Sequence, residues 1–166
     1  GKVETELNIE PWEPSKFLLS GLALSQTTRP ATPAGLGGEV DVLGDEVPLV
    51  ANALQFVPAG TNRLRKSGKA FIYAEIYEPA LAGPDRKGDP GLGVQLSLLD
   101  AKTGVIVKRT DVIGLKPETV AGTSAVPLGM SLPVDELAPG SYTALIDAQD
   151  AAGNHALRRI VFQLEP

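Results

Sequence analysis

The stretch LAPGSYTALIDAQDAAGNHALRRIVFQLEP, residues 137–166, decides the fold class of this chain. Apolar and polar residues alternate in its first half, which is the pattern of a strand with one buried face. The side chains predicted to share that face are Tyr142, Ala144, Ile146 and Ala148. The alternation resumes after residue 154 and predicts a second strand whose inward side chains are Ile160, Phe162 and Leu164. Turn residues separate the two runs, so we expect an antiparallel hairpin.

The motif L-x-P-G-x-Y, made by Leu137, Pro139, Gly140 and Tyr142, leads into the first of these strands. Pro139 and Gly140 favour a turn. We expect the ring of Tyr142 to point inward, where a hydroxyl without a partner would cost about 1 to 3 kcal/mol. Its nearest acceptors are backbone carbonyls a few residues upstream. This arrangement is the tyrosine corner of immunoglobulin-like sandwiches.

The segment from Asp150 to Asn154 predicts the tight turn of the hairpin. The Asp150 side chain can accept hydrogen bonds from the amides of the turn, while Gly153 and Asn154 tolerate a positive φ. Asp150 is therefore interpreted as a turn residue and not as a metal ligand.

Strand patterns recur through the rest of the chain. The run 94–98, a turn at 100–104 and the return at 105–107 predict a second hairpin. Residues 70–78 are apolar on both faces, as in the central strand of a sheet. Weaker strand patterns cover Val3–Glu10, Phe17–Ser25, Leu54–Val57 and Ala125–Leu132. About eight or nine strands without a helical period predict an all-β fold, an antiparallel, immunoglobulin-like β-sandwich.

We expect residues 1–16 to form an N-terminal strand and connector, and residues 17–166 to form the sandwich, with one domain overall. Two Pro/Gly-rich segments, Thr27–Asp45 and Ala80–Gly93, are predicted to be long exposed loops. A short helical turn is an open alternative at Leu49–Leu54. Because the chain begins with Gly1 and no initiator Met, we expect it to be a piece of a longer protein.

Composition excludes several classes of function. A net charge of -5 argues against a nucleic-acid partner, because phosphate binding relies on clustered Lys and Arg. The densest basic run, Arg63, Arg65, Lys66 and Lys69, is interpreted as solvated charges beside a strand. The chain has no cysteine, so it has neither a disulfide nor a thiolate ligand. No apolar run is long enough to span a membrane.

The sequence offers no catalytic constellation and predicts no cofactor. His155 is the single histidine and has no nucleophile motif around it, so we interpret it as an exposed strand residue. One histidine without cysteine cannot supply the usual zinc ligands. Glu75 is the best candidate for a carboxylate with a raised pKa; the alternatives are partial solvation or pairing with Arg or Lys. Calcium has weak support from acids in the two loops, which are Asp41, Asp45, Asp85 and Asp89.

Three further stretches complete a recognisable pattern: FLLSGLALSQ at 17–26, PLVANALQFVPAG at 48–60 and YAEIY at 73–77. Together with L-x-P-G-x-Y and D-x-A-G-N, they resemble the C-terminal immunoglobulin-like or fibronectin-III-like region of bacterial VWFA-related domain proteins. The likeness covers most of the chain as a pattern and is most specific over its C-terminal strands. The chain departs from antibody domains, since it has no cysteine pair and Trp12 lies in a connector. It has no Asp-x-Ser-x-Ser motif, so no metal ligand is carried over.

The resemblance implies an extracytoplasmic location, whether periplasmic, cell-surface or secreted. The strand spacing, the corner motif and the lack of a catalytic constellation predict a non-catalytic accessory or interaction module of a larger envelope or secreted bacterial protein, which makes protein contacts through its loops or an edge strand. Its partner would be a protein: another domain of the same chain or an envelope component. The alternative is a carbohydrate- or ligand-binding sandwich, for which Trp12 and Tyr77 are the aromatic candidates. An enzyme is a third and weaker interpretation.

Overall fold

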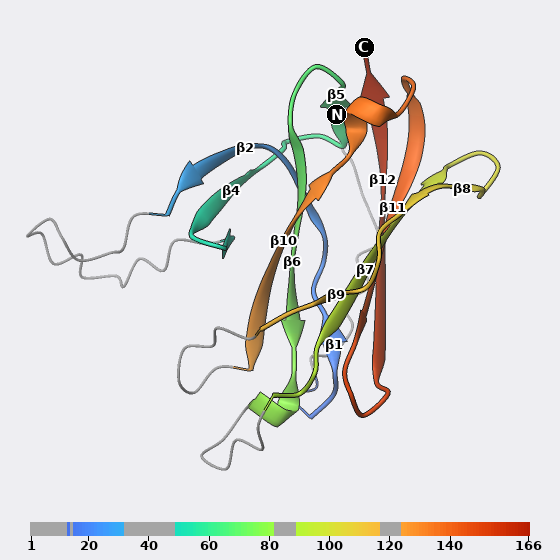
Figure 1. Cartoon of the computed structure of the whole chain (residues 1–166). Helices are drawn as coiled ribbons and strands as arrows, with labels where there is room; N and C mark the ends of the chain where they lie inside the picture. Colours follow the sequence, from blue (N-terminus) through green and yellow to red (C-terminus); the bar gives the residue numbers. More distant parts are fainter. Residues whose placement is uncertain (1–12, 14, 32–48, 82–88, 117–123) are drawn as a thin grey trace, which may run out of the picture.

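Two β-sheets packed face to face form the molecule (Figure 1). The computed structural model describes residues 13, 15–31, 49–81, 89–116 and 124–166. The described part contains twelve strands and two short 3-10 helices, η1 (Pro79–Leu81) and η2 (Val134–Glu136). The all-β sandwich predicted from the strand patterns is confirmed.

The first sheet, sheet A, is built around β6 (Ala70–Tyr77). Strand β10 (Ala125–Leu132) pairs antiparallel with the whole length of β6 on one side. On the other side lie β1 (Leu18–Leu19) and β2 (Ala23–Pro30), each paired with a different part of β6. Strands β4 (Leu54–Pro58) and β3 (Val50–Ala51) follow beyond β2. The predicted central position of residues 70–78 is therefore confirmed.

The second sheet, sheet B, has the order β5-β12-β11-β7-β8, and β9 also pairs with β7. Its strands are β5 (Arg63–Arg65), β7 (Gly93–Asp100), β8 (Ile106–Arg109), β9 (Ile113–Gly114), β11 (Gly140–Gln149) and β12 (His155–Glu165). Both predicted hairpins occur in it, as β7–β8 and β11–β12. The pairing of β5 with β12 is parallel and is the exception to the antiparallel pattern in the described residues.

One core fills the space between the sheets, because each inner face contributes the apolar half of an alternating strand. From sheet A it includes Leu19, Leu24, Ala70, Ile72, Ala74, Ile76, Val126, Leu128, Met130 and Leu132. From sheet B it includes Leu64, Val94, Leu96, Leu98, Tyr142, Ala144, Ile146, Ala148, Phe162 and Leu164. Of the three side chains predicted to point inward from β12, Phe162 and Leu164 are buried and Ile160 is half-buried against the core.

The predicted strand Phe17–Ser25 is in fact two strands with a break between them. At the break, the Ser20 amide donates to the Glu75 carbonyl at 2.8 Å, and the Glu75 amide donates to Ser20 Oγ at 2.9 Å. The serine side chain thus takes over a hydrogen bond that a continuous strand would make with its backbone.

Both predicted loops are shorter than expected, because strands or a short helix occupy residues at their ends. Strand β2 continues through Thr27 to Pro30, Ala80 and Leu81 belong to η1, and Gly93 begins β7. The parts of these loops at 32–45 and 82–88 lie outside the described residues, as do the predicted strand Val3–Glu10 and most of the connector 1–16.

A hairpin occupies residues 49–58, where a helical turn was the alternative. Asn52 and Ala53 form the two-residue connection between β3 and β4, with φ values of 52° and 57°. Positive φ at both positions is the type I′ conformation, which matches the twist of the flanking strands.

A second, smaller apolar cluster covers the outer face of sheet A. Phe56 of β4 lies 5.8 Å from Phe71 and 5.7 Å from Tyr73, measured between ring centroids. The same ring lies over Gly129 of β10, where a Cβ atom would come within 2.4 Å of Phe56 Cζ. The bare glycine therefore makes room for the ring.

Candidate functional site

The corner before β11 has the hydrogen bond expected of a tyrosine corner. The Tyr142 hydroxyl donates to the carbonyl of Ala138, four residues upstream, at 2.7 Å. The Tyr142 ring packs against Phe162 with its centroid 5.8 Å away. Leu137 is buried in the core, Pro139 is exposed, and Gly140 begins the strand. Tyr142 and Leu137 thus have architectural contacts.

The turn between β11 and β12 is closed by Asp150. Its Oδ1 accepts from the Asn154 amide at 2.8 Å, and its Oδ2 accepts from Asn154 Nδ2 at 2.7 Å. Gly153 has a φ of 87°, as its place in the turn predicted, whereas Asn154 does not adopt a positive φ. Partial burial acts to raise the pKa of Asp150, but the hydrogen bonds from Asn154 and the turn amides outweigh it and lower that pKa. Asp150 is therefore held in its charged form.

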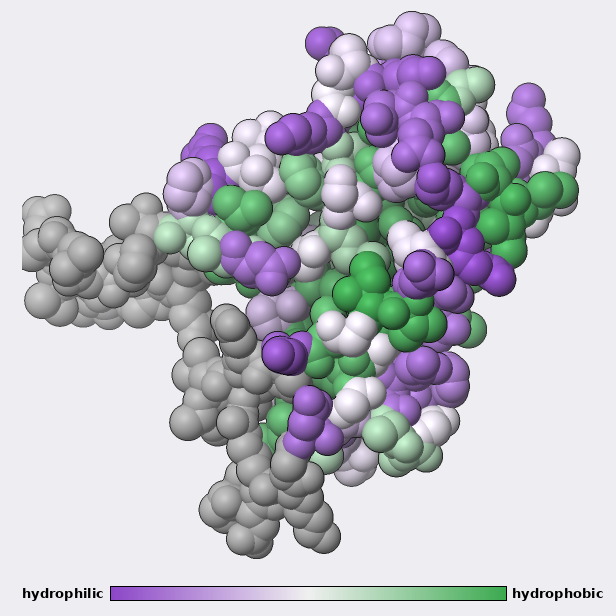
Figure 2. Space-filling model, in the orientation of Figure 1, coloured by the Kyte–Doolittle hydropathy of each residue, from purple (hydrophilic) through white to green (hydrophobic). Residues whose placement is uncertain are grey.

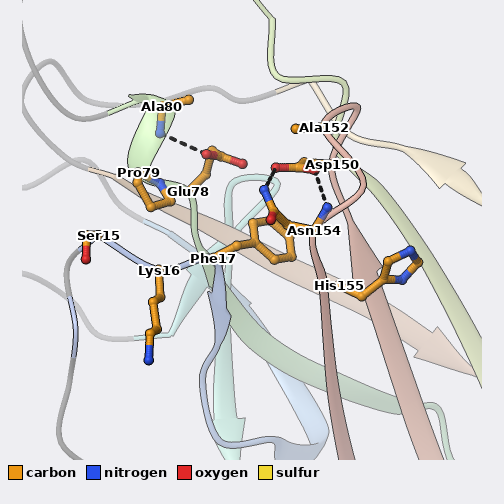
Figure 3. A pocket seen from close by; sticks show the side chains of 10 residues that line it. All are labelled: Ser15, Lys16, Phe17, Glu78, Pro79, Ala80, Asp150, Ala152, Asn154 and His155. Carbon is orange, nitrogen blue, oxygen red and sulfur yellow. Dashed lines mark hydrogen bonds between the residues drawn. The ribbon is translucent and has the colours of Figure 1, made fainter.

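A surface pocket of about 490 Å³ lies beside this turn, at the end of β6 (Figure 3). Glu78, which follows β6 directly, is 3% exposed. Its Oε1 accepts from the Ala80 amide at 2.8 Å, while its Oε2 has no hydrogen-bond partner. Figure 3 shows the Glu78 carboxylate directed toward that of Asp150. Burial raises the pKa of Glu78, the Ala80 amide partly offsets this, and repulsion from Asp150 raises it further.

Glu78 was not among the predicted site residues, although its position in the strand pattern indicated that its side chain is buried. The even-numbered residues of the strand, Ala70 to Ile76, are the inward set. Continuing the period of two by one step places Glu78 on the buried side, at the position where Pro79 ends the strand. An acidic residue at an inward position indicates a buried carboxylate more strongly than an acidic residue on the outer face does.

Glu75, the acid singled out from the sequence, lies on the outer face of β6 and is half-buried. Its carboxylate accepts from the Tyr73 hydroxyl at 3.0 Å and from the Tyr77 hydroxyl at 2.7 Å. Partial solvation, one of the two alternatives for Glu75, is confirmed, and the two tyrosine hydroxyls take the place of the Arg or Lys partner that was the other. Burial, followed by the hydrogen bond to Glu75, raises the pKa of Tyr77 to about 12 and raises that of Tyr73 as well.

The other predicted candidates do not converge on a site. His155 is exposed at the start of β12, with its Nδ1 3.3 Å from Asp147 Oδ1. Asp89 accepts from the Gly91 amide at 2.9 Å, while Asp41, Asp45 and Asp85 lie outside the described residues. In the part of the chain that the structure describes, no group of three or more His, Cys, Asp or Glu side chains could hold a metal ion.

The basic run is spread along β5 and the turn that follows it. Arg63 and Arg65 are exposed on either side of the buried Leu64, and Arg63 pairs with Glu165. Lys66 is half-buried and Lys69 is exposed. The strand period accounts for the spacing of the two arginines.

The outer face of sheet B carries apolar side chains in cross-strand rows. Strand register places Ile106, Leu99, Thr143 and Val161 side by side across β8, β7, β11 and β12. The neighbouring row is Arg109, Ser97, Leu145 and Arg159. Leu157 and Val161 are 54% and 51% exposed. We call this surface, made by Leu99, Ile106, Leu145, Leu157 and Val161 between Arg109 and Arg159, the outer apolar face.

This face continues onto the β8 edge of the sheet. All four residues of β8 are exposed, and so are both residues of β9. Figure 2 shows hydrophobic side chains on the surface at the side of the molecule where Figure 1 draws β8. The exposed apolar residues of this edge are Val105, Ile106, Val107, Val112 and Ile113.

The described aromatic side chains do not form an exposed platform. Every phenylalanine and tyrosine among the described residues is buried or half-buried. The Tyr77 hydroxyl donates to Glu75, and Trp12 lies outside the described residues.

Comparisons with known proteins give little. No protein-family model matches the chain, and a search of curated proteins found no match. Among solved structures, the chain is similar to CopC from Methylosinus trichosporium OB3b, with 20% identity over 58% of this chain and 76% of that one and a TM-score of 0.34. Likeness at this level carries no functional argument. None of the helices in the described residues has the length and apolar character needed to cross a bilayer.

Proposed function

We propose that the chain is a non-catalytic interaction module that binds a protein through the outer apolar face and the adjoining β8 edge. The observation that supports this most is the exposure of Leu157 and Val161 on a sheet face that also carries Leu99, Ile106 and Leu145, with polar side chains between them. Side chains at these positions do not contribute to the hydrophobic core, because the core lies on the opposite face of the sheet. Their burial against a partner would remove apolar surface from water.

The charges beside this face define the chemistry of the partner. Arg109 and Arg159 flank Leu145 in one cross-strand row, and both are exposed. Arg109 Nε donates to Ser97 Oγ at 3.1 Å, which holds one guanidinium against the face. A partner that offers apolar side chains with nearby carboxylates fits this arrangement, because opposite charges at the rim guide association.

The β8 edge adds a second mode of contact. An edge strand offers backbone groups on which an extended segment of another protein can pair. The exposed Val107 of this strand and Val105 directly before it would contribute apolar contacts to such a segment. The face and the edge are continuous, so one partner can use both.

Site-specific photo-crosslinking tests this proposal. A photoreactive amino acid at position 161 should crosslink a protein in the native host, and the same amino acid at position 131 should not, because Ser131 is exposed on β10 of the other sheet. The crosslink from position 161 should be lost in Leu157→Asp, which places a charge within the outer apolar face. Equal crosslinking from positions 161 and 131 would contradict the proposal.

We also propose that the module belongs to a larger envelope or secreted bacterial protein of the VWFA-related kind, and that it is immunoglobulin-like and extracytoplasmic. The tyrosine corner at Tyr142 and the two-sheet sandwich support the immunoglobulin-like assignment. Reading the complete encoding gene tests the rest. A signal peptide and a neighbouring A-type domain are expected, and a cytoplasmic enzyme domain fused to this one would contradict the assignment.

A further inference from the structure

The carboxylate of Glu78 is the least satisfied polar group in the described residues. It is almost completely buried, and one of its oxygens has no hydrogen-bond partner. A buried charge normally has a partner, because losing hydration without compensation is costly. Here the nearest charged group that the carboxylate faces is Asp150, which has the same sign (Figure 3).

The pocket does not supply a cation of its own among its described lining. Lys16 lines the pocket, but its ammonium group pairs with Glu13 at 2.8 Å. Figure 3 shows the Lys16 side chain directed away from Glu78. His155 also lines the pocket, and its ring points away from Glu78 and pairs with Asp147.

We propose that Glu78 and Asp150 form a binding site for a divalent cation of the calcium class. Glu78 would provide the unpartnered Oε2, and Asp150 would provide a carboxylate that its own turn keeps charged. Calcium takes six to eight oxygen ligands and accepts irregular geometry. Water from the open pocket can complete the shell, since the Asn154 side chain directs its Nδ2, and not its oxygen, toward Asp150 (Figure 3).

The site would tie together two distant parts of the chain. Glu78 ends the central strand of sheet A, while Asp150 lies in the β11–β12 turn of sheet B. A cation between them would crosslink the two sheets at one end of the sandwich. Two acids give a modest charge, so we expect a dissociation constant of about 10⁻⁴ to 10⁻³ M, as in extracellular calcium modules.

Calorimetric titration with CaCl₂ tests the proposal directly. Chelator-treated protein at neutral pH should bind about one Ca²⁺ per chain at concentrations up to about 10 mM. The melting temperature should rise by several degrees in CaCl₂ relative to NaCl of equal ionic strength, because the ion binds the folded form alone.

Two variants with the same change of charge locate the ion. Glu78→Gln should weaken Ca²⁺ binding at least tenfold. Without the ion it should melt no lower than the wild type, because it removes a buried charge and keeps the shape of the side chain. Asp135→Asn alters an exposed acid in η2 and should bind Ca²⁺ like the wild type.

Three results would overturn the proposal. One is the absence of Ca²⁺ binding to the wild type in this range. Another is equal affinity in Glu78→Gln and the wild type, which would place the ion elsewhere. The third is a melting temperature that rises on mild acidification and ignores Ca²⁺, which would show that a shared proton neutralises the pair. None of these results bears on the outer apolar face, since that face is made of other residues.

Discussion

Ala53 adopts a backbone conformation that glycine would adopt with less strain. Its φ is 57°, in the second position of a two-residue turn. For an L-residue with a Cβ atom this conformation costs about 1 to 2 kcal/mol, and glycine adopts it freely. Ala53→Gly should therefore raise the free energy of unfolding by up to about 1 kcal/mol, after the greater entropy of glycine in the unfolded chain is subtracted.

Chemical denaturation measures this change, and Ala101→Gly is the matched control. Ala101 is an exposed turn residue and is not among the described residues with positive φ. The control should lose stability through the entropy of glycine alone. If both variants lost stability equally, the strain attributed to Ala53 would not exist.

The Tyr142 hydroxyl is the next residue-scale test. It donates to the Ala138 carbonyl in a partly buried hydrogen bond, and the Tyr142 side chain itself is buried. Tyr142→Phe keeps the ring and removes the hydrogen bond, so the free energy of unfolding should fall by about 1 to 3 kcal/mol. Urea denaturation with an unchanged slope would assign the loss to this contact. An unchanged midpoint would mean that the hydroxyl does not stabilise the corner.

At the scale of the element, the packing of the β3–β4 hairpin over β10 depends on Gly129. A Cβ atom at this position would lie 2.4 Å from Phe56 Cζ, so Gly129→Ala must displace the ring. Overpacking of this kind costs about 1 to 3 kcal/mol. Thermal unfolding of Gly129→Ala should show that loss, whereas Gly60→Ala, which has open space at its Cβ, should stay within about 0.5 kcal/mol of the wild type.

A double-variant cycle shows whether the ring causes the loss. Phe56→Leu shortens the side chain that Gly129→Ala would strike, so the double variant should be more stable than the sum of the two single changes predicts. Additive changes would mean that the β10 backbone, and not the hairpin, responds to the added methyl group.

The outer face of β6 predicts a dependence on alkaline pH. Tyr77 has its pKa raised to about 12 by burial and by its hydrogen bond to Glu75. The folded state therefore keeps a proton that the unfolded chain releases near about pH 10. The free energy of unfolding is unaffected below that pH and falls as the pH rises from about 10 to about 12.

Phenolate absorbance of the folded protein tests the cause. Glu75→Gln removes the negative charge beside both tyrosine hydroxyls, so the pKa of Tyr77 should move down toward its ordinary value. The absorbance titration of the variant should then begin at lower pH than that of the wild type. Identical titration curves would show that burial alone sets the pKa.

At the scale of the whole molecule, the sequence predicted those strands and buried faces that an alternation of apolar and polar residues specifies. The alternation in residues 140–149 and 155–165 specified the β11–β12 hairpin and its buried side. The two apolar faces of residues 70–78 indicated a central strand, and the strand does lie between two apolar clusters. Where a side chain replaces a backbone bond, as Ser20 does beside Glu75, the pattern predicted a continuous strand and was wrong.

The candidate sites depend on pairings that no local pattern contains. Glu78 and Asp150 are separated by most of sheet B in the chain, and only the packing of the two sheets brings them to one pocket. The outer apolar face likewise needs the register of four strands. The parallel pairing of β5 with β12 joins segments that are far apart in the sequence, so no local pattern could predict it.

The topology predicts a gradient of local stability across the sandwich. Strand β11 is bonded along its length to β12 and β7, and β6 is bonded to β10 on one side and to β1 and β2 on the other. Opening either strand requires most of the core to separate, so their amides should exchange at rates near the limit of global unfolding. Strand β8 lies at an edge with all four residues exposed and should open separately, at much lower cost.

Native-state hydrogen exchange, resolved by residue, measures this order. Amides in the middle of β6 and β11 should exchange slowest, and those of β8 and β9 should exchange orders of magnitude faster. A bound partner on the β8 edge should slow exchange in β8 while leaving β6 unchanged, because the core already protects β6. If β8 in the isolated protein were as protected as β11, the edge would be closed to an added strand, and that mode of partner binding would be contradicted.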